Sequence, residues 1–159
     1  MTYDYQLFFM NFKQNILSDL KEAMKSGDTM KRDTFRFLLS VVKNVEIEKK
    51  KKETGLTDEE VLEVIARSIK QRKDSVEQYT AGGRLDLAEK EQKEIDILMS
   101  YMPKQLGEEE IREIVKETII EVNAISKADI GKVMSAVMKK LKGKANGSAV
   151  KKIVESLVS

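Results

Sequence analysis

Apolar residues recur at intervals of three or four positions along most of the chain, and this helical period constrains the fold more than any other feature of the sequence. Only one proline, Pro103, interrupts these stretches, and the residues between the apolar positions are mostly good helix formers. No segment shows the strict alternation of apolar and polar residues that is typical of a half-buried strand. The sequence therefore predicts an all-α protein.

The N-terminal part of the chain is expected to contain about four helices. Thr57 and Glu60 have the spacing of a capping box, which predicts a helix start, while glycines and Pro103 mark the helix ends. The expected helices run from about Leu7 to Ser26, from about Thr29 to the charged run 48–53, from Thr57 to about Tyr79, and from about Arg84 to Tyr101. The apolar stripe of the first helix consists of Phe9, Phe12, Ile16, Leu20 and Met24.

The C-terminal part has the most regular pattern. Three apolar stripes follow nearly the same order of steps, and short links with helix-start residues join them, so we expect a compact three-helix module. The helix-start residues are Ser126 and Asp129 in the first link and Asn146 and Ser148 in the second. The stripes are Ile111, Ile114, Val115, Thr118, Ile119 and Val122; Ile130, Val133, Met134, Val137, Met138 and Leu141; and Val150, Ile153, Val154, Leu157 and Val158. This pattern predicts an N-terminal helical domain at 1–104 and a C-terminal module at 105–159.

The composition excludes several kinds of functional site. The chain contains no cysteine and no histidine, so disulfides, thiolate nucleophiles, imidazole bases and the usual zinc sites are absent. No phosphate loop of the G-x-x-x-x-G-K-[ST] type is present. Glu91 and Glu94 lie among Lys90 and Lys93, so their carboxylates need no metal ion to balance them. We therefore expect no catalytic residue, no metal and no cofactor.

The apolar run at residues 7–10 bears on where in the cell the protein is expected. It is far too short to span a bilayer, and it lacks the basic leader of a secretory signal. We expect a cytoplasmic protein with no membrane partner.

Charge is unevenly distributed along the chain. Residues 1–104 contain nineteen basic and nineteen acidic side chains, whereas residues 124–159 contain eight basic and two acidic ones. On the expected helix from Ile130, a rotation of about 100° per residue places Lys132 and Lys139 opposite the apolar stripe, with Lys140 and Lys142 on their flanks. A wholly basic outer face of this kind is suited to phosphate. The candidate nucleic-acid-binding residues are Lys132, Lys139, Lys140, Lys142, Gly143, Lys144, Asn146, Lys151 and Lys152.

The other side of the module is expected to be acidic, because the preceding helix turns Glu113, Glu117 and Glu121 to solvent. From the residues alone, two interpretations of the lysines stay open. Lysines on the outer face of an amphipathic helix also serve solubility, and two glycines four residues apart form an ordinary link. The run Lys49–Lys52 is flanked by glutamates and is expected to be a solvated helix end.

Four strings in this order resemble the YqeY family: IKQRKDSVEQY at 69–79, GGRLDLAEKEQKEIDIL at 82–98, YMPKQL at 101–106 and KADIGKVMSAVMKKLKGKANG at 127–147. That family consists of small bacterial proteins similar to the C-terminal tail of the B subunit of the aspartyl/glutamyl-tRNA amidotransferase. Its G-K-x-M motif falls on Gly131, Lys132 and Met134, and its K-G-K-A-[ND] motif on 142–146. One departure is Gly107, where the family usually has serine before the acidic run.

The resemblance implies a non-catalytic accessory protein that binds tRNA through the basic face of its C-terminal module and supports glutamine-dependent tRNA transamidation. The family association with carbon–nitrogen ligase activity, with glutamine as amido-N-donor, comes from the amidotransferase, in which catalysis takes place outside the related tail. The alternative is a protein-interaction adaptor for a transamidation or RNA-processing enzyme, without direct RNA binding. A free-standing ligase would require nucleotide and glutamine sites that are not found in the sequence.

Overall fold

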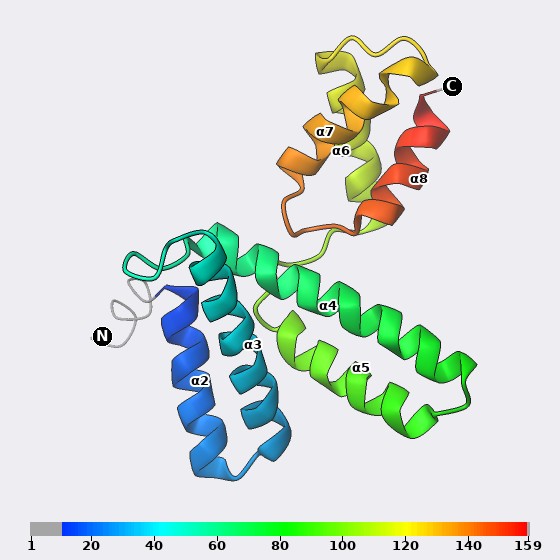
Figure 1. The fold of residues 1–159 in the computed structure, drawn as a ribbon. Coiled ribbons are helices and arrows are strands. Elements are labelled where there is room, and N and C mark those ends of the chain that lie inside the picture. Colours follow the sequence, from blue (N-terminus) through cyan, green and yellow to red (C-terminus); the bar gives the residue numbers. More distant parts are fainter. Residues whose placement is uncertain (1–10, 159) are drawn as a thin grey trace, which may run out of the picture. The chain divides into compact units, whose positions relative to one another are not determined.

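The computed structural model describes residues 11–158, which form seven α-helices and one short 3-10 helix and contain no strand (Figure 1). The all-α prediction is confirmed. The chain divides into two compact units, of which the first ends at Tyr101 and the second begins at Met102. The predicted domain limits, 1–104 and 105–159, stay a prediction, and each unit is described by itself.

The first unit consists of two helical hairpins. Helices α2 and α3 lie side by side, as do α4 and α5, and α3 packs against both helices of the second hairpin (Figure 1). The helices are α2 (Phe12–Ser26), α3 (Thr29–Glu48), α4 (Asp58–Ala81) and α5 (Leu85–Met99). Its largest fully buried side chains are Ile16, Leu38, Ile65 and Leu98. Each comes from a different helix, so the hydrophobic effect holds the two hairpins together.

The first helix departs from the sequence prediction at its start. Asn11 has extended backbone angles, and its side chain accepts a hydrogen bond from the N–H of Gln14, so α2 begins at Phe12 and not at Leu7. The predicted residues 7–10 lie outside the described part of the chain. Met24 was expected on the apolar stripe, but its side chain is 53% exposed because neighbouring Ala23 takes the buried position.

The predicted capping box at the start of α4 is confirmed. The Thr57 hydroxyl accepts from the Glu60 N–H at 3.2 Å, and the Glu60 carboxylate accepts from the Thr57 N–H at 2.9 Å. The same carboxylate binds the ammonium groups of Lys49 at 3.0 Å and Lys51 at 2.8 Å. Glu60 therefore ties the loop after α3 to the start of α4. These bonds, with that of Lys51 foremost, lower the pKa of Glu60 to about 2.

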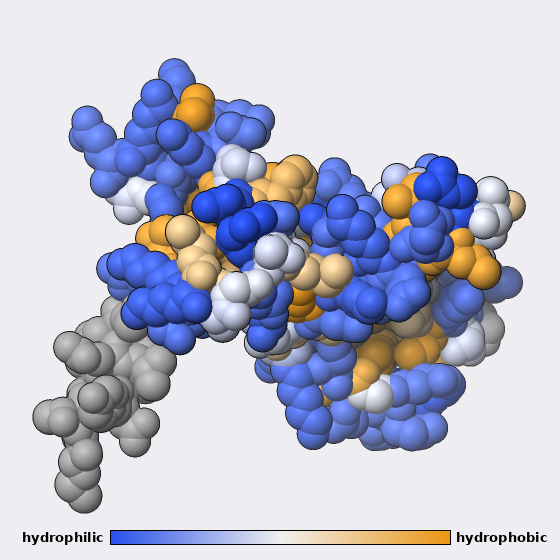
Figure 2. Space-filling view, turned by 90° about the horizontal axis from the view of Figure 1, so that it is seen from below, coloured by the Kyte–Doolittle hydropathy of each residue, from blue (hydrophilic) through white to orange (hydrophobic). Residues whose placement is uncertain are grey.

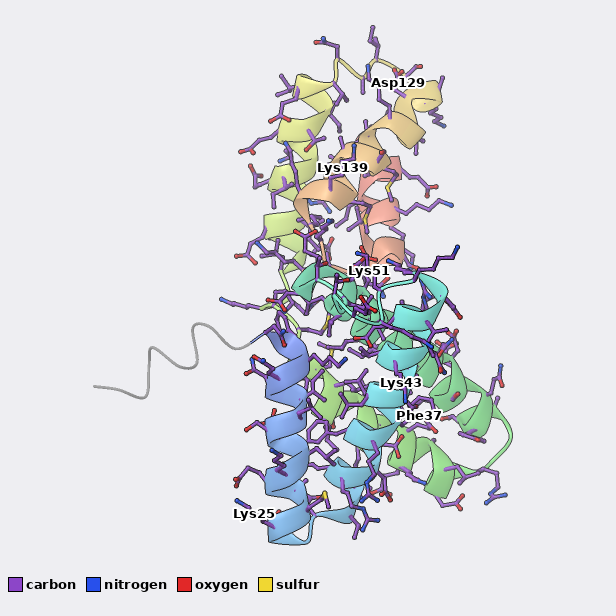
Figure 3. The ribbon with its side chains drawn as sticks, turned by 60° about the vertical axis from the view of Figure 1, so that its left-hand side comes forward. Lys25, Phe37, Lys43, Lys51, Asp129 and Lys139 are labelled. Atoms are coloured by element: carbon purple, nitrogen blue, oxygen red, sulfur yellow. The ribbon has the colours of Figure 1, made fainter. Side chains whose placement is uncertain are left out.

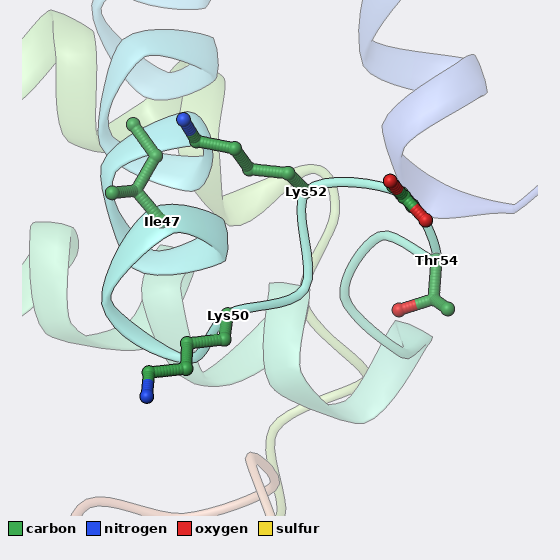
Figure 4. A pocket seen from close by; sticks show the side chains of 5 residues that line it. Ile47, Lys50, Lys52 and Thr54 are labelled. Atoms are coloured by element: carbon green, nitrogen blue, oxygen red, sulfur yellow. The ribbon is translucent and has the colours of Figure 1, made fainter.

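The other two lysines of this run line a shallow hollow of about 430 Å³ beside Ile47. Figure 4 shows that the side chains of Lys50 and Lys52 point away from each other across this hollow. Their ammonium groups do not converge on one ligand position. Lys50 and Lys52 therefore agree with the prediction of a solvated helix end, whereas Lys49 and Lys51 do not, because they bind Glu60.

Replacing Glu60 with Gln should abolish a pH-dependent part of the stability of the first unit. Gln keeps the capping acceptor but loses the charge that binds the two lysines. Because folding lowers the pKa of Glu60, its contribution is complete above the unfolded value near 4.5 and is lost as the pH falls towards 2. Urea unfolding should therefore show Glu60→Gln less stable than the parent at about pH 7, with the difference vanishing near pH 2. A difference that stayed constant over this range would contradict the proposed tether.

The second unit is a three-helix module in which each α-helix packs against the other two. The helices are α6 (Glu108–Glu121), the 3-10 helix η1 (Lys127–Asp129), α7 (Ile130–Lys140) and α8 (Gly147–Leu157). The three apolar stripes supply its core, which contains Ile111, Val115, Val133, Val137, Leu141, Val150, Ile153, Val154 and Val158. The helical stripes predicted from the sequence are confirmed.

The links of this module follow the predicted start signals. The Asp129 carboxylate (Figure 3) accepts from the backbone N–H groups of Ile125 and Ser126, and these bonds lower its pKa. Asn146 accepts from the N–H of Ser148 at 2.9 Å and caps α8. At α6 only half of a capping box is possible, because Gly107 has no side chain and only its N–H donates, to Glu110.

Among the described helices, none is long and apolar enough to cross a membrane. Figure 2 shows mainly hydrophilic side chains on the face that it presents, with small hydrophobic areas between them.

Candidate nucleic-acid interface

The candidate residues lie on one helix–loop–helix segment of the second unit. Lys132, Lys139 and Lys140 belong to α7, the range 142–146 forms the connecting loop, and Lys151 and Lys152 belong to α8. The loop is held in place by the segment that precedes α6. The Leu106 N–H donates to the carbonyl of Lys144 at 2.9 Å, and the Gln105 amide donates to that of Gly143 at 2.7 Å.

Gly143 and Asn146 have local structural roles in this loop. Gly143 has a φ of +68°, a left-handed conformation that side-chain-bearing residues rarely adopt. A Cβ atom added there would also lie 3.5 Å from the end of the Met102 side chain. Asn146 caps α8, as described above. These two residues therefore shape the loop, which in turn sets where the lysines around it are presented.

Two of the candidate lysines bind the C-terminal end of α6. The ammonium group of Lys132 donates to the backbone carbonyl of Val122 at 2.9 Å, and that of Lys140 lies 2.6 Å from the Glu121 carboxylate. Positive charge is favourable at this end of a helix, where the carbonyl groups lack intrahelical partners. The prediction of a wholly basic face separated from an acidic one is therefore wrong at Lys140, because the two helices pack so that Glu121 meets it.

Two more candidate lysines interact with other groups of the same chain. Lys151 lies 3.9 Å from Glu155 on the same helix, and both side chains are largely exposed, so this pair is weak. Lys142 also interacts within the chain. The ammonium groups of these residues are therefore not the strongest candidates for binding phosphate.

The remaining three lysines present unpaired ammonium groups. Lys139, Lys144 and Lys152 are exposed and make no ion pair or side-chain hydrogen bond within residues 11–158. Lys139 lies two positions from the fully buried Val137, and Lys152 two positions from the fully buried Val150. A separation of two positions is a rotation of roughly 160° on a helix, so both lysines point away from the core. Figure 3 marks Lys139 on α7.

The first unit contains a charged cluster that the sequence analysis missed. The Arg72 guanidinium on α4 binds Glu91 at 3.0 Å and also binds Glu94, both on α5. The Arg72 and Glu94 side chains are only 13% and 11% exposed. The guanidinium carbon also lies 5.4 Å from the ring centre of Phe37 on α3. The sequence contained an indication of this cluster, because Arg72 and Glu91 each interrupt the apolar stripe of a helix. Pairing the two residues, however, requires knowing that α4 lies against α5.

This cluster changes the interpretation of the two glutamates. Their nearest opposite charge is Arg72, and not the neighbouring Lys90 and Lys93; the ammonium group of Lys93 binds Glu89 instead. Within the part of the chain that the structure describes, no group of three or more acidic side chains could hold a metal ion.

Comparison with known proteins places the chain in a family. A family model described as Yqey-like protein matches residues 13–158. Several curated yeast proteins named "Altered inheritance of mitochondria protein 41, mitochondrial" are also similar. The Lachancea thermotolerans protein is 36% identical over 94 residues, which cover 59% of this chain and 49% of that protein. The Kluyveromyces lactis protein is 46% identical over 84 residues, or 52% and 44% of the two chains.

The Saccharomyces cerevisiae strain YJM789 protein is 42% identical over 84 residues, which cover 53% of this chain and 44% of that protein. The chain therefore spans about half the length of the curated relatives it matches. The family match, by contrast, extends over nearly the whole chain and confirms the resemblance noted in the sequence. The chain belongs to the YqeY family.

Proposed function

We propose that this protein binds tRNA through the segment of its second unit that consists of α7, the connecting loop and α8. The observation that supports this function best is the set of three exposed ammonium groups, Lys139, Lys144 and Lys152, without partners in the described chain. They lie in a segment, 124–159, with eight basic and two acidic residues. Binding of phosphates there releases counterions, which supplies the free energy of association.

The mode of binding follows from the residue types. Lysine ammonium groups act as point charges on flexible stems, so they recognise the sugar–phosphate backbone and the shape of a folded RNA and not its base sequence. No aromatic residue follows Tyr101 in the sequence. Stacking of unpaired bases is therefore not part of binding by this unit.

In this proposal the protein is an accessory factor without its own catalytic residues, acting in support of glutamine-dependent tRNA transamidation. The carbon–nitrogen ligase association of the family then reflects the amidotransferase and not this chain. A cytoplasmic location stays a prediction, since the similar yeast proteins bear mitochondrial names.

Titration of fluorescently labelled bulk tRNA with the full chain, followed by anisotropy, tests the proposal. We expect saturable binding that unlabelled tRNA competes away and that weakens as salt is added. Absence of binding at low salt would overturn the proposed function.

A second candidate function is that of a protein-interaction adaptor for a transamidation or RNA-processing enzyme. Two isoleucines favour it: Ile120 on α6 is 75% exposed, and Ile125 in the following link is 87% exposed. A partner protein that covered these side chains would remove their apolar surface from water. Recovery of a stoichiometric protein partner after nuclease treatment, lost in Ile120→Ser/Ile125→Ser, would favour the adaptor, whereas loss of every partner upon nuclease treatment would favour RNA binding.

A further inference from the structure

A hollow in the first unit lies beside an exposed aromatic ring. It has a volume of about 310 Å³ and is lined by Phe37, Ser68, Gln71, Arg72, Ser75 and Glu91. These residues come from α3, α4 and α5, three helices that pack against one another. The space, termed the Phe37 hollow, is large enough for one ring system but not for a helix of a partner protein.

The ring is held in place although half of it faces solvent. Phe37 is 53% exposed, which forfeits much of the free energy that its burial would contribute. The Arg72 guanidinium lies 5.4 Å from the ring centre, and the two glutamates of α5 fix that guanidinium in turn. Phe37, termed the Phe37 platform, therefore has a guanidinium over one face of its ring and keeps exposed aromatic surface on which a second flat group can stack.

Polar groups surround this platform. The hollow is lined by Ser68, Gln71 and Glu91, residue types whose side chains offer hydrogen-bond donors and acceptors. The Nε atom of Arg72 is buried and makes no hydrogen bond within the described chain. This mixture of groups resembles what the edge of a heterocyclic base requires, whereas a purely apolar ligand would leave the polar groups unpaired.

The charged residues near the ring indicate the sign of the charge that a ligand would carry. Arg36 and Lys43, on the same helix as Phe37, are exposed and make no ion pair within residues 11–158. Figure 3 shows Phe37 and Lys43 on neighbouring parts of α3. A cationic side chain of a partner would meet repulsion from these two residues. The Arg72 guanidinium adds no net positive charge, because Glu91 and Glu94 both bind it. The phosphate groups of a nucleotide, by contrast, are attracted to Arg36 and Lys43.

We infer that the Phe37 hollow binds an unpaired nucleobase of an RNA, stacked on the Phe37 ring, with the adjoining phosphates held by Arg36 and Lys43. This inference rests on the proposed RNA binding and adds a contact that reads single-stranded RNA to the backbone contacts of the second unit. Stacking on one aromatic side chain is sequence-tolerant because every base has a π-face.

The absence of tryptophan from the chain allows a direct test. Phe37→Trp introduces a single tryptophan into the platform, and Leu85→Trp introduces one at a position of α5 that is 65% exposed and does not line the hollow. Both full-length variants are titrated with a labelled oligouridylate, with inorganic polyphosphate and with an oligolysine peptide. Tryptophan emission reports stacking, and anisotropy of the labelled RNA reports binding separately.

We expect the oligouridylate to quench Phe37→Trp but not Leu85→Trp, and polyphosphate to quench neither. Phe37→Leu, which keeps an apolar side chain but removes the ring, should bind the oligouridylate about 5- to 150-fold more weakly, the range typical of one lost stacked base. RNA binding by anisotropy without quenching of Phe37→Trp would overturn the inference but leave the proposed function standing. Equal quenching by polyphosphate, or quenching by oligolysine alone, would also overturn it. Absence of oligouridylate binding would overturn the inference alone, whereas absence of binding in the tRNA titration would overturn the proposed function as well.

Discussion

Reversing the charges of Lys139, Lys144 and Lys152 to Glu together should lower the affinity of the full chain for tRNA by at least about 100-fold at about 0.1 M salt. Each phosphate contact contributes close to one decade of affinity under these conditions through counterion release. The three ammonium groups have no partner within the described chain, so their loss leaves no buried charge behind. Anisotropy of labelled tRNA measures the change.

In the matched control, three exposed lysines of the first unit are replaced with Glu, which reverses their charges: Lys21, Lys25 and Lys31. Either set changes the formal net charge from +2 to −4, which is six units. The control variant should lose far less affinity, because only general electrostatic attraction is weakened. Equal losses in the two variants would show that net charge, and not this set of three lysines, determines binding.

Replacing Arg72 with Met should lower the free energy of unfolding of the first unit by about 3–5 kcal/mol, the largest stability effect that we expect in this protein. The substitution keeps an apolar stem of similar length but leaves the Glu94 carboxylate, 11% exposed, without its cation. A second carboxylate, Glu91, also loses its partner. Urea unfolding followed by circular dichroism measures the loss.

The control for this prediction also neutralises the two carboxylates that lose their partner when Arg72 is replaced. Adding Glu91→Gln and Glu94→Met to Arg72→Met should restore most of the lost stability, because an apolar side chain of similar volume is tolerated where a buried unpaired charge is not. An Arg72→Met variant as stable as the parent would contradict the assignment of the cluster as a buried ionic lock between α4 and α5.

The apolar cores were predictable because they depend on local periodicity. Val133, Val137 and Val150 lie on stripes whose spacing forces them to one side of a helix, whatever that helix packs against. The capping box at Thr57 is similarly local, since its two bonds join residues three positions apart. Features that depend only on spacing within one helix could therefore be predicted from the sequence.

The partners of charged residues could not be predicted in this way. Lys140 meets Glu121 nineteen positions away, and Arg72 meets Glu94 twenty-two positions away. Each pair exists because two helices cross at a particular angle, which the apolar spacing of either helix does not determine. For this reason the prediction from the sequence counted too many lysines as available to a ligand. It also did not identify the Phe37 platform.

The dependence of tRNA affinity on salt tests the account most directly. The logarithm of the association constant, measured for the parent chain and for the Lys139, Lys144 and Lys152 charge-reversal variant, is plotted against the logarithm of the salt concentration. If these three ammonium groups contact phosphates, the slope of the parent should be steeper than that of the variant by about 2 to 3 units. Parallel lines for the two proteins would contradict the account.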